Sequence, residues 1–194
     1  MTSLEVGAFS RCLAIVAFES QSPHYKTING ILYNGDVTEI LDYPAGNSSL
    51  TEYVVPDTVT TLRSNCIDDA VHLTKITLPN SITTIESCAF MKSGITEITF
   101  PSKITEIAEG VCSYCENLTT VTINSNITAI KARAFMNCPA LTTIIINDST
   151  PPTLDASALT GCTNLTAIKV PAGSVASYQR ATNWKNFSSI IKSK

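Results

Sequence analysis

Two cysteines three residues apart, Cys112 and Cys115, have the spacing in this 194-residue sequence that most resembles a chemical site. A C-x-x-C pair can bind a metal ion or exchange a disulfide with another thiol. A four-cysteine zinc site would need a second such pair, and the sequence has none. Cys115 also occupies one position of a repeating unit, where Cys12, Cys138 and Cys162 recur. We therefore interpret it as a small buried residue between repeats, and we expect neither a metal nor a cofactor.

Histidines and paired acids offer little further chemistry. His24 and His72 are the only histidines, and neither lies in a motif that pairs it with a nucleophile or a metal. We expect both at the surface or in turns. Asp68 and Asp69 are adjacent, but their loop lacks the alternating oxygen ligands of an EF-hand, so we interpret them as solvated turn charges. The sequence therefore predicts a protein that is not an enzyme.

Composition excludes two further classes of function. The net charge is −3, and the 13 lysines and arginines are scattered, so the chain has no basic footprint for nucleic acid. No stretch approaches the ~18 apolar residues of a membrane helix, and the first residues show no export signal.

Seven cysteines leave at least one thiol without a partner in the chain. We expect a monomer or part of a longer chain.

A fixed period organises most of the sequence. Its units begin at positions 56, 79, 101, 124, 147 and 171, which are 23, 22, 23, 23 and 24 residues apart. Each unit contains an alternating apolar pattern, L-x-x-I-x-I/L, that is typical of a half-buried strand. Stacking such units about 4.8 Å apart pairs each strand with its neighbours and closes one apolar core. The pattern is carried by Leu73-Ile76-Leu78, Ile95-Ile98-Phe100, Leu118-Val121-Ile123, Leu141-Ile144-Ile146 and Leu165-Ile168-Val170.

Three further apolar columns are expected to face inward. Segments such as IESCAFMKS and IKARAFMNC are expected to form one or two helical turns, too short to stand alone. The columns are Val59, Ile82, Ile104 and Ile127; Leu62, Ile85, Ile107 and Ile130; and Phe90, Cys112, Phe135 and Leu159.

The period divides the chain, 1–194, into four parts of a single repeat domain. Residues 1–18 repeat part of a coil from Leu4 onward, which indicates a fragment of a longer protein or an apolar end that needs a partner. Residues 19–50 break the period, and Asn34-Gly35 predicts a β-hairpin insertion there. Five repeats occupy 51–170. Residues 171–194 are expected to form a C-terminal cap, with a short helix followed by Trp184, Phe187, Ile190 and Ile191.

The repeat consensus I-T-x-I-x-x-x-A-F-x-x-C-x-x-L-T-x-I-x-I, best matched by ITAIKARAFMNCPALTTIII, closely resembles the leucine-rich repeats of BspA-type bacterial surface proteins. The 19–50 segment and the C-terminal unit also resemble that family's interrupting hairpin and terminal unit. The resemblance implies a β-rich α/β solenoid, a right-handed superhelix of about 23-residue coils with a parallel sheet. It implies a cell-surface or secreted adhesion protein and no catalytic residues. The chain departs from the pattern at Asn65-Cys66-Ile67 and at Cys112, which replaces phenylalanine.

The polar face of the predicted strands is the candidate binding surface, because solenoids usually bind ligands there. The preferred hypothesis is a recognition module that binds an extracellular protein or glycan through this sheet face, the hairpin insertion, or both. The alternative is a structural spacer with an inert face, since threonine also suits an exposed strand for structural reasons. No aromatic platform lies on this face, which weakens a sugar-stacking model. The candidate ligand-binding residues are Lys75, Thr77, Glu97, Thr99, Thr120, Thr122, Thr143 and Lys169.

Overall fold

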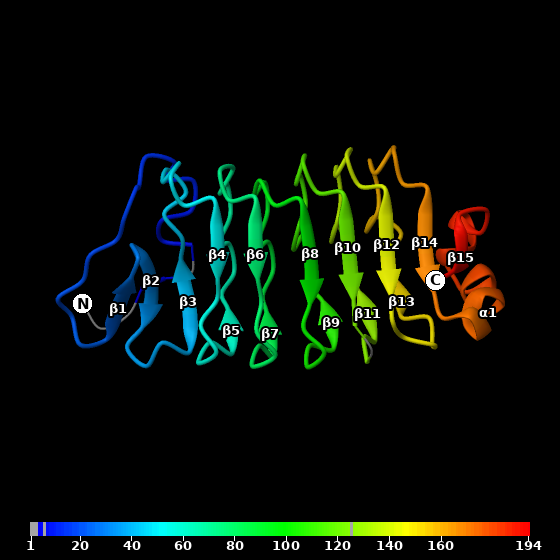
Figure 1. The fold of residues 1–194 in the computed structure, drawn as a ribbon, viewed down its shortest axis with the longest axis horizontal. Helices are drawn as coiled ribbons and strands as arrows, with labels where there is room; N and C mark the ends of the chain where they lie inside the picture. The colour runs from blue at the N-terminus through cyan, green and yellow to red at the C-terminus, as the bar shows by residue number, and fades with distance from the viewer. Residues whose placement is uncertain (1–3, 6, 125) are drawn as a thin grey trace.

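Residues 4–5, 7–124 and 126–194 are described by a computed structural model of the protein. The chain winds into an elongated stack of coils, with β1 (Tyr25–Ile28) and β2 (Ile31–Asn34) near one end and the C-terminal segment near the other (Figure 1). Short strands recur once or twice in each coil and lie beside the equivalent strands of the next coil. The solenoid expected from the 23-residue period is therefore confirmed.

One side of the stack is a row of parallel strands formed by the L-x-x-I-x-I/L segments. Two pieces make up this row: one pairs β4 with β6, and the other runs β8-β10-β12-β14-β15. Their register follows the repeat, since Val121 lies opposite Ile98 on one side and Ile144 on the other. The strands are β4 (Glu52–Val54), β6 (Lys75–Thr77), β8 (Glu97–Phe100), β10 (Thr120–Ile123), β12 (Thr143–Ile146), β14 (Ala167–Val170) and β15 (Ile191–Ser193).

A second row of shorter parallel strands comes from the I-T-x-I half of each unit. It joins β3 to β5 and β7, and β9 to β11 and β13. The three inward-facing columns of apolar residues that the sequence predicts, which include Val59 and Phe135, are buried. They lie between the two rows of strands and the turns that link them. The strands are β3 (Glu39–Asp42), β5 (Thr61–Leu62), β7 (Thr84–Ile85), β9 (Glu106–Ile107), β11 (Ala129–Ile130) and β13 (Thr153–Leu154).

The segments that contain the Ala-Phe pair, such as IESCAFMKS and IKARAFMNC, form hydrogen-bonded turns. The prediction of helical turns in these segments is therefore wrong. Alternate backbone N–H groups donate to the following coil, as Phe90 does to Val111 O at 2.8 Å and Cys112 to Ala134 O at 2.9 Å. The groups between them donate three residues back in their own segment, as Met91 does to Cys88 O at 3.0 Å. Residues four apart, such as Cys88 at φ 58° and Lys92 at φ 57°, take left-handed conformations that end any helical run. Bonding between coils therefore replaces helix formation.

Threonine hydroxyls form two ladders along the stack, which explains much of the threonine in this sequence. In the first, each hydroxyl donates to the backbone carbonyl of the equivalent threonine one coil earlier, as Thr119 Oγ1 does to Thr96 O at 2.9 Å. The first ladder runs through Thr51, Thr74, Thr96, Thr119, Thr142 and Thr166. The second follows the same rule through Thr38, Thr60 and Thr83 and through Thr105, Thr128 and Thr153.

Replacing Thr119 with valine is expected to destabilise the protein, because valine keeps the shape and removes the ladder bond. One such hydrogen bond is worth about 0.5–1.5 kcal/mol. Thr122→Val is the matched control, since Thr122 lies on the outer strand face. Urea unfolding of both variants measures the difference, and equal stabilities would show that the ladder contributes nothing.

The predicted hairpin around Asn34-Gly35 is confirmed, because β2 pairs antiparallel with β3 across a loop that begins at Gly35. A second, tighter hairpin turns at Asn29-Gly30. Strands β1 (Tyr25–Ile28) and β2 (Ile31–Asn34) pair antiparallel, with Asn29 at φ 53° and Gly30 at φ 77°. Two consecutive positive φ values define the type I′ turn that suits a two-residue hairpin. The sequence contains two Asn-Gly pairs, and the strand signal around the first is weaker.

Asn34 holds the longer loop between β2 and β3. Its side-chain oxygen accepts the backbone N–H groups of Thr38 at 2.8 Å and Glu39 at 3.0 Å. Gly35 is needed for space, since a Cβ atom there would lie 2.8 Å from Pro23 O. Strand β3 pairs antiparallel with β2 on one side and parallel with β5 on the other, so the insertion is continuous with the coil stack.

Residues 7–12 repeat the turn geometry of the later coils. Gly7 at φ 71° and Arg11 at φ 63° are four residues apart, as Cys88 and Lys92 are. Ser10 Oγ donates to Asp68 Oδ2 at 2.7 Å and ties this segment to the next coil. The part of the 1–18 assignment that covers residues 1–3 and 6 lies outside the described residues.

The C-terminal segment seals the last coil with short helices and one added strand. It comprises η1 (Ala172–Ser174), α1 (Val175–Arg180), η2 (Trp184–Phe187) and then β15, which pairs parallel with β14. Trp184 is fully buried, and its ring lies 5.2 Å from that of Tyr178 in an edge arrangement. Its indole N–H donates to Pro152 O at 2.7 Å. The strand β15 was not anticipated from the sequence.

Candidate binding surface

The eight residues predicted to bind a ligand all lie on β6, β8, β10, β12 and β14, but they differ in exposure. Those on β6 and β8 are exposed, while those on the later strands are half-buried. The face is therefore most accessible at β6 and β8. The exposed group is Lys75, Thr77, Glu97 and Thr99, and the half-buried group is Thr120, Thr122, Thr143 and Lys169.

A hollow of about 350 Å³ lies where the strand row is interrupted between β6 and β8. These strands are neighbours without a shared ladder, although Thr96 N–H still donates to Thr74 O at 3.0 Å just before them. All four exposed residues of the predicted surface line this hollow. Its lining is Lys75, Ile76, Thr77, Leu78, Asn80, Glu97, Thr99, Pro101 and Asn124.

The coil that leads into β8 is shorter than its neighbours at Gly94. Only Gly94 separates Ser93 from Ile95, whereas two residues separate Cys115 from Leu118 in the next coil. The backbone lies close to the preceding coil at this point, since the Gly94 N–H donates to Ala70 O at 3.0 Å. A Cβ atom on Gly94 would lie 2.1 Å from Val71 O, so only glycine fits. The interruption of the strand row follows this shortened turn.

Gly94→Ala is expected to destabilise the fold and to alter the hollow, because the backbone of one coil must move away from Val71. Overpacking of this kind costs roughly 1–3 kcal/mol. Gly173→Ala is the matched control, since a Cβ there meets nothing within 4 Å. Chemical denaturation measures both. Equal stability of the two variants would contradict the close packing at Gly94.

The charges beside the hollow remain available to a ligand. Lys75 Nζ lies 3.7 Å from Glu52 Oε2, and both side chains are more than half exposed, so water screens the pair and it contributes little. Asn124 is more constrained, because its Nδ2 donates to Phe100 O at 2.9 Å. The hollow thus presents an ammonium group, a carboxylate, hydroxyls and amides above apolar side chains. Such a set suits hydrogen bonding to a polar ligand.

Five lining residues were not among the predicted ones. Ile76 and Leu78 belong to the apolar L-x-x-I-x-I/L pattern, and Asn80, Pro101 and Asn124 follow the strands along the chain. The 22-residue spacing and Gly94 were visible in the sequence, and together they marked the irregular coil. What the sequence could not show was that the shortening interrupts the strand row on this face.

In the repeat column, Cys115 and Cys138 are small buried donors, as expected, while Cys162 is half-buried and donates to Phe135 O at 3.0 Å. The Cys115 thiol donates to Phe90 O at 3.1 Å, and Cys138 repeats the bond to Cys112 O at 3.1 Å. Burial raises the pKa of the Cys112 and Cys138 thiols, which keeps them protonated. Cys12 differs because it is exposed, so the expectation of a buried residue is wrong there.

The remaining candidates for chemistry are separated along the molecule. His24 and His72 are exposed, as expected. Asp69 is half-buried and pairs with Lys92 at 3.5 Å, but Asp68 is buried. The interpretation of Asp68 as a solvated charge is wrong, because the N-terminal segment covers it through Ser10.

Comparison with known families identifies the repeat. A family model described as the BspA-type leucine-rich repeat region matches residues 38–166 in six copies. The chain belongs to the BspA-type leucine-rich repeat family. The copies begin at residue 38, within the segment assigned to the hairpin insertion, and β3 pairs with β5 there. The BspA-type array thus extends further toward the N-terminus than the five repeats found by period alone.

Solved structures similar to this BspA-type chain come from bacteria. A leucine-rich cell surface protein from Faecalibacterium prausnitzii is 27% identical with a TM-score of 0.77, covering 96% of this chain and 47% of that one. A leucine-rich repeat protein from Eubacterium ventriosum is 26% identical with a TM-score of 0.62, covering 80% and 48%. The pneumococcal vaccine antigen PcpA, 18% identical over 91% of this chain and 49% of its own, shares the fold with a TM-score of 0.65.

This chain thus spans about half the length of the first two similar structures, 47% and 48%. No curated protein matches it. Among the described residues, no helix has both the length and the apolar character required to cross a membrane.

Proposed function

We propose that this chain is a non-catalytic recognition or adhesion module of a cell-surface or secreted protein. It binds an extracellular protein or glycan through the strand face centred on the hollow between β6 and β8. The observation that carries this proposal is that hollow, which gathers four exposed polar residues, Lys75, Thr77, Glu97 and Thr99, at an irregularity of an otherwise regular sheet.

Rigidity of the face supports binding. The strands and turns beneath it are held by backbone bonds between coils and by the threonine ladder, so the polar groups are already in position before a ligand arrives. Preorganised groups lose less conformational freedom on binding. The described lining contains no aromatic ring, which favours a protein over a stacked sugar.

Location at the cell surface is supported by the family and by the similar Faecalibacterium prausnitzii protein, which is a leucine-rich cell surface protein. An array exposed outside the cell meets matrix proteins and the glycans of other cells. The ladders also fit the alternative of a spacer, because they explain much of the threonine without a ligand.

Binding of the purified chain to immobilised fibronectin, fibrinogen and a broad glycan panel at physiological salt tests the proposal. We expect saturable binding to at least one surface, and loss of that binding when the chain is unfolded by heat. The control surface is coated with serum albumin. Absence of saturable binding across the panel would favour the spacer.

A further inference from the structure

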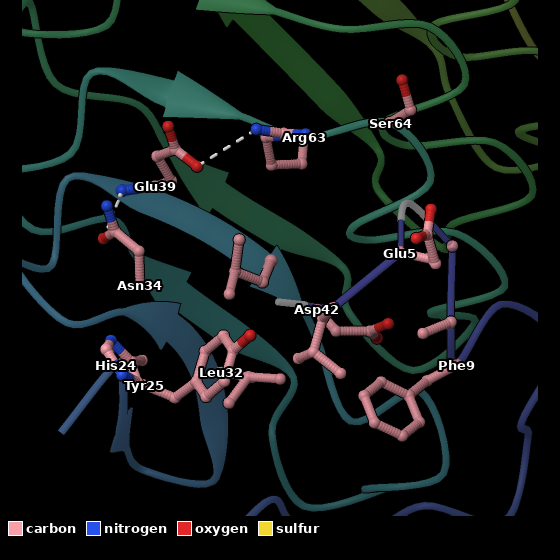
Figure 2. Close-up of a pocket in the computed structure, with 14 residues that line it drawn as sticks. Glu5, Phe9, His24, Tyr25, Leu32, Asn34, Glu39, Asp42, Arg63 and Ser64 are labelled. Atoms are coloured by element: carbon pink, nitrogen blue, oxygen red, sulfur yellow. Dashed lines mark hydrogen bonds and ion pairs between the residues drawn. The ribbon is translucent and has the colours of Figure 1, made fainter. Parts of the chain in front are cut away.

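A pocket of about 290 Å³ lies at the N-terminal end of the stack, away from the strand face (Figure 2). Three segments form it: the N-terminal residues around Phe9, the β1-β2 hairpin, and β3 with the start of the following coil. Leu4, Phe9, Leu32 and Leu41 give it apolar walls, and Asp42 lies among them. Figure 2 shows the Asp42 carboxylate directed toward the segment that carries Glu5 and Phe9.

Asp42 is a buried acid without a cation. It is only 7% exposed, and no other side chain of the described residues donates a hydrogen bond to it or forms an ion pair with it. Arg63 also lines the pocket, but its guanidinium is engaged by Glu39 at 3.3 Å and Glu86 at 3.5 Å. A buried carboxylate is costly unless something pairs with it.

The chemistry of the pocket selects the kind of cation. Residues 4–5, 7–124 and 126–194 contain no group of three His, Cys, Asp or Glu side chains that could hold a metal ion. Apolar walls with an acid among them instead match an amphipathic cation, whose aliphatic stem packs against leucine and phenylalanine while its charged head reaches the carboxylate. Arginine and lysine side chains have this form.

We propose that this pocket accepts a basic side chain, arginine or lysine, of a polypeptide partner, with Asp42 supplying the counter-charge. Glu5 and Glu39, which also line the pocket, add negative charge that attracts the incoming cation. This site is separate from the hollow between β6 and β8, so the two can be tested independently.

Binding is expected to depend on pH, because the cation pairs with the ionised form of Asp42. Burial and the nearby Asp68 raise the Asp42 pKa to about 7, while the backbone N–H of Tyr43 lowers it. The other ionisable groups around the pocket are Glu5, His24, Tyr25, Glu39 and Arg63, with Cys66 buried nearby in the next coil. Affinity should therefore increase between about pH 6 and pH 8 as Asp42 loses its proton.

The test uses the intact chain and Nα-acetyl-arginine methylamide as the probe, followed by two-dimensional NMR. The neutral control is the corresponding citrulline compound, which has nearly the same shape. We expect saturable shifts at the amides of Leu32 and Asp42, with a dissociation constant of about 1–10 mM. The citrulline compound and the Asp42→Asn variant should each bind at least ~10-fold more weakly, because the charge pair is lost.

Asp57→Asn makes the same chemical change at an exposed position and should bind within about twofold of the unaltered protein. A thermal melt of each variant confirms that it is folded. The proposal is overturned if arginine and citrulline probes bind equally, if Asp42→Asn binds as well as the unaltered protein, or if no saturable shift occurs below about 50 mM probe.

Discussion

Replacing Trp184 with alanine is expected to lower the free energy of unfolding by roughly 3–5 kcal/mol, the usual cost of truncating a large buried aromatic. Trp184 is fully buried in the C-terminal cap, and its ring packs against Tyr178 at 5.2 Å. Its loss also leaves Pro152 O without the indole donor at 2.7 Å. Because each coil of a solenoid contacts only its neighbours, a loosened cap exposes the apolar end of the array.

Urea unfolding followed by far-ultraviolet circular dichroism measures this effect, since the variant lacks the only tryptophan of the chain and gives no tryptophan fluorescence. Lys185→Ala is the matched control, because Lys185 is adjacent and exposed. It should change stability by less than about 0.5 kcal/mol. A Trp184→Ala variant as stable as this control would contradict the sealing role of the cap.

Asp42→Asn is expected to stabilise the protein above pH 7, an unusual result for a buried polar residue. Burial, reinforced by the charge of Asp68, raises the Asp42 pKa from 3.8 to about 7. The folded state therefore binds this proton more tightly than the unfolded state, and ionisation of Asp42 costs stability. A difference of three pKa units corresponds to on the order of 4 kcal/mol.

The penalty has a defined pH window. It is absent below the unfolded pKa near 4, grows as pH increases, and is complete above the folded pKa near 7. The stability of Asp42→Asn relative to the unaltered protein should therefore increase from pH 4 to pH 7 and then level off, as measured by urea unfolding at several pH values. Asp57→Asn, an exposed change, should show no such trend. A constant difference for Asp42→Asn across this range would be inconsistent with a buried, unpaired carboxylate.

The repeat spacing predicted the stack of coils well, because every coil places its apolar residues in the same columns. Once Ile98, Val121 and Ile144 share a column, their parallel pairing follows from the spacing alone. The same logic placed Phe135 and Cys138 in the core. The segments that contain the Ala-Phe pair were less predictable, because their local sequence suits a helical turn while many of the bonds that hold them come from the neighbouring coil.

Both candidate sites arise where the repeat is irregular, and the sequence revealed them only in part. The strand face was predicted from alternation, but the greater exposure of Lys75 and Glu97 depends on the shortened turn at Gly94. Asp42 was not singled out, because its burial results from the contact between a hairpin and an N-terminal segment far away in sequence. Contacts between segments outside the repeats do not change the repeat spacing, so the spacing could not predict them.

The direct test of the central claim is the affinity of a triple variant, Lys75→Ala, Glu97→Ala and Thr120→Ala, for the ligand that the binding panel identifies. These changes remove polar groups from β6, β8 and β10 and leave the buried positions of the strands intact. The proposed role of the strand face predicts a loss of affinity of at least about 30-fold with an unchanged melting temperature. Unchanged affinity in the folded variant would contradict it and would place the binding surface elsewhere on the molecule.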